Sequence, residues 1–119
     1  MADDPRGPLL RRVVAYEMPI EPVLEALANL PYDCERDLVQ VTPRDVVSMI
    51  DRCARGDLSI DQLTDWADLL ESRDGVGFAP PHAEHISEAL FRIGNPTLQG
   101  AVTHQVLSDL RAKLVSLAG

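Results

Sequence analysis

The chain has 119 residues, 45% of them apolar, and a formal net charge of −8. This length is enough for one ordinary domain with a single hydrophobic core. The negative charge disfavours binding to nucleic acid or to an anionic membrane, because both carry the same sign, and it makes a basic protein the favoured kind of partner.

The N-terminal residues to about Pro8 are expected to be disordered, and residues 9–17 form either a helix or an extended arm. Acidic residues stand where a signal peptide would have lysines, and arginines interrupt the nearby apolar run. No export signal or membrane-spanning segment is therefore predicted. The two cysteines, Cys34 and Cys53, lack a C-x-x-C spacing, so we expect free thiols and a cytoplasmic protein.

The stretch MPIEPVLEALANLPYD predicts a short amphipathic helix, with Pro22 in its first turn and Pro31 ending it. Its apolar residues recur at helical spacing: Ile20, Val23, Leu24 and Leu27. A connector follows, and its apolar residues predict a brief extended segment near residues 38–41.

The next helix has clear signals at both ends. Thr42 can cap it, Pro43 suits the first helical position, and Asp45 completes the spacing of a capping box. Gly56 can adopt the left-handed conformation that ends a helix. We therefore expect a helix from Pro43 to shortly before Gly56.

A second capping box, Ser59 with Gln62, predicts a helix from Ile60 to Ser72 or Arg73. Its apolar stripe consists of Ile60, Leu63, Ala67 and Leu70. Trp66, the only tryptophan of the chain, lies at the edge of this stripe. A tryptophan in that position usually packs its ring on the core and gives its indole N–H to a polar partner, so we expect Trp66 to be largely buried.

Two further helices follow the SRDGVGFAPP loop. The first halts at Gly94-Asn95-Pro96 and aligns four apolar residues: Ala83, Ile86, Leu90 and Ile93. The second starts near Thr103, and its inner face carries Val106, Leu107, Leu110, Leu114 and Leu117. Four or five short amphipathic helices without strand hairpins predict a single all-α domain, folded as a compact helical bundle.

Asp61, Asp65 and Asp68 are spaced by four and three residues, so they share one exposed face of the Trp66 helix, with Glu71 at its flank. Such a stripe is either an ordinary solvated face or a docking face for a basic protein partner. In the second interpretation these four carboxylates bind the partner, and Trp66 contributes from the edge of the stripe.

Histidines offer a different kind of site. His82 and His85 lie three residues apart at a helix start, which is a spacing that could hold a metal together with His104 from another helix. The segment lacks the zincin pattern, and surface histidines explain it without a ligand. We therefore predict no metal site, although a small metal-dependent enzyme remains an alternative.

The sequence contains no nucleophilic signature around its cysteines, Ser59 or its histidines. Ser59 serves as a helix cap, and Cys53 shares a helix face with core residues such as Met49 and Ile50, which is typical of a buried thiol rather than an activated one. No catalytic residue and no cofactor is predicted.

The segment GDLSIDQLTDWADLLESRD, followed by LFRIGNP and THQVL, resembles a group of small bacterial helical proteins over residues 42–117. Its beginning is also similar to the colicin-D-type immunity proteins, in which a glycine, a polar cap and a short amphipathic helix recur. That resemblance implies a small acidic helical bundle that covers the positive active site of a secreted RNA-cleaving toxin. Leu63 stands where that family has an aromatic residue, and no functional residue is transferred from the family.

Three functions are compatible with these features. An immunity-like inhibitor accounts for the charge, the acidic stripe and the size. A structural or scaffold subunit of a bacterial assembly accounts for the same features. A metal-dependent enzyme depends on the His82/His85 segment alone.

Overall fold

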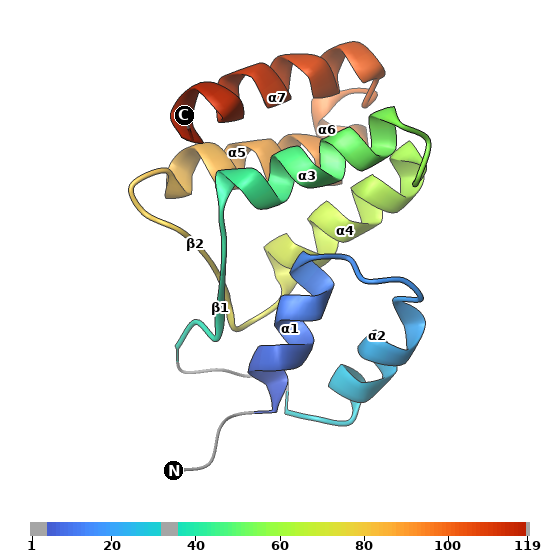
Figure 1. Cartoon of the computed structure of the whole chain (residues 1–119), viewed down its shortest axis with the longest axis vertical. Coiled ribbons are helices and arrows are strands. Elements are labelled where there is room, and N and C mark those ends of the chain that lie inside the picture. The colour runs from blue at the N-terminus through green and yellow to red at the C-terminus, as the bar shows by residue number, and fades with distance from the viewer. Residues whose placement is uncertain (1–4, 32–35, 119) are drawn as a thin grey trace.

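The computed structural model describes residues 5–31 and 36–118, and most of these residues lie in seven helices (Figure 1). In chain order these are α1 (Arg6–Val14), α2 (Glu21–Ala28), α3 (Pro43–Ala54), α4 (Ile60–Ser72), α5 (Ala83–Gly94), α6 (Pro96–Gln99) and α7 (His104–Ala118). Two short strands complete the described fold, β1 (Val39–Val41) and β2 (Val76–Phe78). The prediction of a compact all-α fold is confirmed.

Helices α3 and α4 begin at the two predicted capping boxes. The Thr42 hydroxyl accepts a hydrogen bond from the Asp45 backbone N–H at 3.3 Å, and the Asp45 carboxylate accepts one from Thr42 N–H at 2.8 Å. Ser59 and Gln62 make the same reciprocal pair at 3.1 and 2.8 Å. Gly56 follows α3 with a φ of +85°, as expected of a glycine that ends a helix. These local signals fix both ends of α3 and the start of α4.

Removing either cap should destabilise the protein. We expect Thr42→Ala and Ser59→Ala each to lower the free energy of unfolding by about 0.5–2 kcal/mol, because each leaves a backbone N–H of the first helical turn without its partner. Ser48→Ala is the matched control, since Ser48 is exposed within α3 and caps nothing. Urea denaturation of the three variants measures the difference. A cap variant as stable as the Ser48 control would contradict this role.

The helices pack as pairs around a common core. Helix α4 packs on α5, α3 packs on α7, and α1 packs on α2. Figure 1 shows α3, α5 and α7 at one end of the molecule and α1 with α2 at the other, with α4 between them. The largest buried side chains of the core include Trp66, Leu70, Ile86, Leu90 and Ile93. Helix α4 thus connects the two ends of the fold.

The structure departs from the sequence predictions at three places. Helix α1 starts at Arg6, so the disorder expected to Pro8 is wrong for residues 6–8, while residues 1–4 lie outside the described chain. The short helix α6 was not predicted. Strand β2 lies inside the expected loop and pairs in parallel with β1, with Val39 opposite Val76 and Val41 opposite Phe78.

Helix α5 ends at Gly94, as the Gly94-Asn95-Pro96 sequence predicted, and Gly94 has a further role there. It is the last residue of α5, and a Cβ atom placed on it would lie 2.9 Å from the Asp68 backbone nitrogen and 3.3 Å from the Ala67 carbonyl carbon. The end of α5 is explained by Asn95, because the residue before a proline disfavours helical backbone angles. Gly94 therefore lets α5 approach the backbone of α4 closely.

Candidate functional site

Trp66 is a core residue rather than part of the α4 surface. Its side chain is only 1% exposed, and its indole N–H donates to the carbonyl oxygens of Val13 at 3.1 Å and Val14 at 3.2 Å. The prediction of burial is confirmed. The prediction that Trp66 touches a partner from the edge of the acidic stripe is wrong, because α1 covers the ring.

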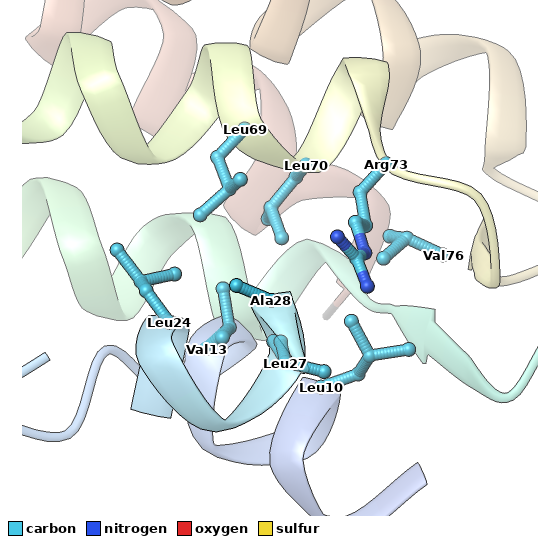
Figure 2. Close-up of a pocket in the computed structure, with 9 residues that line it drawn as sticks. All are labelled: Leu10, Val13, Leu24, Leu27, Ala28, Leu69, Leu70, Arg73 and Val76. Atoms are coloured by element: carbon cyan, nitrogen blue, oxygen red, sulfur yellow. The ribbon is translucent and has the colours of Figure 1, made fainter. Parts of the chain in front are cut away.

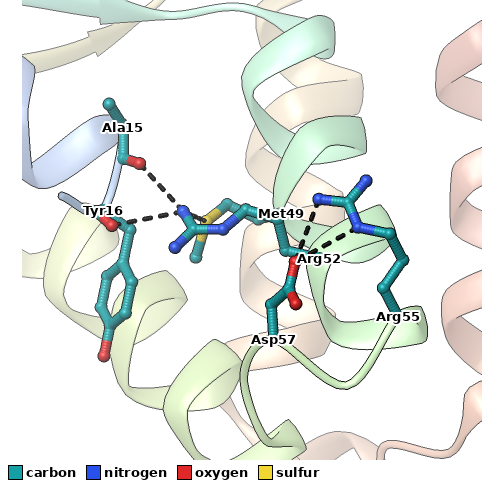
Figure 3. A network of polar contacts seen from close by, with 6 residues as sticks. All are labelled: Ala15, Tyr16, Met49, Arg52, Arg55 and Asp57. Carbon is teal, nitrogen blue, oxygen red and sulfur yellow. Dashed lines mark hydrogen bonds and ion pairs between the residues drawn. The ribbon is translucent and has the colours of Figure 1, made fainter. Parts of the chain in front are cut away.

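Arg52 makes a second connection to the end of α1 (Figure 3). Its guanidinium donates to the carbonyl oxygens of Ala15 at 3.1 Å and Tyr16 at 3.2 Å and lies 5.7 Å from the centre of the Tyr16 ring. A cation is favourable there because the C-terminal end of a helix carries partial negative charge. Trp66 and Arg52 together hold α1 against α3 and α4.

The predicted aspartates share the exposed side of α4. Asp61, Asp65 and Asp68 are all exposed, and within the described residues none of their carboxylates forms an ion pair or a hydrogen bond. Other acidic residues of the molecule do have such partners, as Asp51 has in Arg111. The α4 carboxylates therefore present negative charge that no ion pair within the described part of the chain neutralises.

Glu71 differs from these aspartates because it is partly buried. Its carboxylate accepts a hydrogen bond from the Asn95 side chain at 2.9 Å, which connects α4 to the end of α5. Burial is the main cause that raises the pKa of the Glu71 carboxyl, and nearby Asp68 raises it further, whereas the hydrogen bond from Asn95 lowers it. Glu71 thus contributes to the helix interface as well as to the flank of the stripe.

The raised pKa predicts a pH-dependent effect of Glu71→Gln. The folded state favours the protonated carboxyl of Glu71. The stability that this proton binding adds is fully present below the ordinary pKa of 4.5, and it is lost as the pH rises through the raised pKa of the folded state. The variant cannot ionise, and its amide oxygen can still accept from Asn95. We therefore expect Glu71→Gln to be more stable than the parent chain at pH 7 and to lose this advantage below pH 4.5.

Thermal unfolding from pH 3.5 to 7, at roughly half-unit steps around the reference carboxyl pKa, measures this difference. Glu25→Gln is the control, because Glu25 is an exposed glutamate within α2. A Glu71→Gln variant less stable than the parent at pH 7 would show that the charged carboxylate stabilises the fold.

Tyr16 lies near acidic residues of two different helices, which the sequence analysis did not predict. Glu21, the first residue of α2, and Asp65 both lie close enough to Tyr16 to raise the pKa of its hydroxyl, although burial of the ring is the larger cause. Arg52 acts in the opposite direction. Glu21 and Asp65 are 44 positions apart in the chain, and the packing of α1 on both α2 and α4 brings them near the same tyrosine. We use the name acidic face for Asp61, Asp65 and Asp68 on the exposed side of α4.

The histidines do not assemble the metal site that was considered as an alternative. In residues 5–31 and 36–118, no group of three or more His, Cys, Asp or Glu side chains is placed to hold a metal ion. His82 and His85 lie at the start of α5, whereas His104 starts α7 and lines a separate pocket of about 390 Å³ beside Cys53. Within the described chain, His104 is therefore not brought to the other two histidines, as the alternative metal site would have required.

Cys53 is the buried core thiol that the sequence predicted. It is a free cysteine, 4% exposed, and burial raises the pKa of its thiol. A raised pKa reduces the thiolate fraction, which is the reverse of what a nucleophilic cysteine needs. Cys34 lies outside the described residues.

Comparison of the chain with protein-family models, curated proteins and solved structures found no match. Each helix of the described chain is too short or too polar to cross a lipid bilayer.

The surface feature with the clearest chemistry is the acidic face, whose exposed carboxylates are suited to binding lysine and arginine side chains.

Proposed function

We propose that this chain is a cytoplasmic acidic protein-binding module without catalytic activity, and that its acidic face docks a basic protein. The observation that carries the proposal is the set of exposed aspartates on α4 that form no ion pair among the described residues. Carboxylates of this kind accelerate the encounter with a basic partner and can pair with its cations in the complex.

The rigidity of α4 supports this use of its surface. The helix is capped at Ser59, and its opposite side is anchored by buried Leu63, Trp66 and Leu70. Side chains on a rigid helix keep their spacing, so less ordering is required when a partner binds. The acidic face is therefore presented in a fixed arrangement.

The basic partner we propose is a bacterial toxin, with this chain as its immunity-like inhibitor. The net charge of −8, the small helical fold and the resemblance of the beginning of the residue 42–117 segment to colicin-D-type immunity proteins support this more specific proposal. The buried free thiol of Cys53 supports a reducing compartment such as the cytoplasm. A cation-rich active site covered by the acidic face would be closed to its RNA substrate.

Zero-length carbodiimide cross-linking in cells that produce the protein tests the proposal, because this reagent joins carboxylates directly to lysines of a bound protein. We expect mass spectrometry to find Asp61, Asp65 or Asp68 joined to lysines of one basic protein. Cross-links confined to Glu84 and Glu88, which are exposed on α5, would contradict docking on α4.

The cross-linked protein also distinguishes inhibitor from scaffold. The inhibitor proposal expects a partner that cleaves RNA when alone and is silent when this chain is added. A partner that binds the acidic face but has no such activity would favour the scaffold function.

A further inference from the structure

The end of α5 and the short helix α6 carry two exposed apolar side chains. Phe91 is 39% exposed and Leu98 is 71% exposed, whereas most large apolar side chains of the described chain are buried. Asn95 lies between them. Its side-chain amide donates to the Phe91 carbonyl oxygen at 2.9 Å, and its own carbonyl oxygen accepts from the Leu98 N–H at 3.1 Å. We use the name apolar pair for Phe91 and Leu98.

The apolar pair borders the acidic face. The Asn95 amide nitrogen that donates to Phe91 also donates to a Glu71 carboxylate oxygen at 2.9 Å, so the end of α5 lies directly against α4. Three positions after Phe91, a Cβ atom placed on Gly94 would lie 2.9 Å from the backbone nitrogen of Asp68, the last aspartate of the acidic face. Exposed apolar surface and negative charge are therefore neighbours on adjoining helices.

Arg92, the basic residue next to Phe91, has its partners in a different part of the molecule. Its guanidinium donates to two carbonyl oxygens in the link between α6 and α7, Gly100 at 2.7 Å and Ala101 at 3.1 Å. Within the described part of the chain, no ion pair joins Arg92 to an aspartate of α4. The negative charge beside the apolar pair is thus available to a partner.

A second apolar feature is a pocket of about 230 Å³ between α1, α2, the end of α4 and β2 (Figure 2). Its lining is apolar apart from Arg73, which is already engaged within the molecule. Such a lining favours apolar occupants in general. The apolar pair has a defined charge beside it and therefore specifies the chemistry of its partner more closely.

The acidic face and the apolar pair together fit a segment that is both basic and apolar. Protein interfaces commonly have an aromatic anchor near the centre and charged side chains around it. Carboxylates attract lysine and arginine and repel acidic segments. An apolar side chain packed on the apolar pair would remove Phe91 and Leu98 from water, which is favourable.

We propose that the basic partner docks through an amphipathic segment, whose apolar side chain packs on the apolar pair while its lysine or arginine side chains face the aspartates of α4. This inference rests on the proposed docking through the acidic face and adds the chemistry of the docked segment. Charge acts mainly on the rate of association, whereas close apolar packing acts mainly on the rate of dissociation. The two parts of the surface can therefore be tested separately.

Stopped-flow kinetics with the partner that cross-links to the acidic face tests the inference. We expect the dissociation rate to rise about ten-fold in Phe91→Ala and about three-fold in Leu98→Ala, with little change in the association rate. Val115→Ala is the matched control, because Val115 is 41% exposed on α7, which packs mainly on α3. This control should leave both rates unchanged.

Thermal unfolding shows whether each variant keeps its fold. Leu98 is exposed on the short helix α6, so Leu98→Ala tests the site even if Phe91→Ala unfolds the chain. Folded variants of the apolar pair that dissociate no faster than Val115→Ala would overturn this inference. Docking by charge would still stand if lysine reversals on α4 slowed association. Reversals that left association unchanged would instead contradict the proposed function and this inference with it.

Discussion

Replacing Trp66 with Ala should lower the free energy of unfolding by about 3–5 kcal/mol, the usual effect of removing a large buried side chain. The Trp66 ring is almost fully buried, and its N–H satisfies the carbonyl oxygens of Val13 and Val14 at the end of α1. Those carbonyls belong to the last turn of α1, where the regular helical N–H partners run out, and the Val13 oxygen also accepts from the Tyr16 N–H at 2.9 Å. The variant therefore loses both core packing and a connection between α4 and α1.

Chemical denaturation followed by circular dichroism measures this loss. Trp66→Phe is the matched variant, because it keeps an aromatic ring and removes the N–H donor. We expect it to be destabilised less than Trp66→Ala but more than the parent chain. A loss below about 1 kcal/mol for Trp66→Ala would show that the ring is not packed in the core.

Gly94→Ala should have the second large effect, with a loss of about 1–3 kcal/mol in the free energy of unfolding. The new Cβ would lie 2.9 Å from the backbone nitrogen of Asp68. Backbone atoms within a helix cannot rotate aside as a flexible side chain can, so α5 must move away from α4. This separation outweighs the gain in helix propensity that alanine normally brings, which is about 1 kcal/mol.

Gly7→Ala is the matched control for this substitution. Gly7 also lies in a helix, and its added Cβ would have the Leu38 carbonyl oxygen as a neighbour at 3.9 Å, an ordinary contact distance. We expect this variant to be as stable as the parent chain or slightly more stable. Equal behaviour of the two glycine variants in urea denaturation would contradict the close approach of α5 to α4.

The helices that the sequence predicted best are those with local signals. Thr42 with Asp45 and Ser59 with Gln62 specify helix starts through residues three positions apart, and the structure confirms both capping boxes. The extended segment near residues 38–41 is also confirmed, as β1. These features depend on neighbouring residues and do not require knowledge of the tertiary fold.

The features that the sequence did not predict depend on distant parts of the chain. Strand β2 has three residues, and its partner β1 lies 37 positions earlier, so no local pattern distinguishes it from a loop. Periodicity placed Trp66 at the edge of a stripe, but α1 covers that edge. Glu21 and Asp65 come near the same Tyr16 side chain only through the packing of α1 on α2 and on α4.

Docking through the acidic face is the central claim, and the rate of association with the cross-linked partner tests it most directly. The variant carries three reversals, Asp61→Lys, Asp65→Lys and Asp68→Lys. Its control reverses three exposed carboxylates on α5 and α7, Glu84, Glu88 and Asp109, and has the same net charge. Because all six residues are exposed, neither variant should lose much stability.

Stopped-flow measurements at low and high salt then separate the effect of the acidic face from the effect of total charge. We expect the α4 variant to associate about ten-fold or more slowly than the control at low salt, with the difference shrinking as salt screens the charges. Equal association rates and equal salt dependence for the α4 variant and the α5/α7 control would contradict docking through the acidic face.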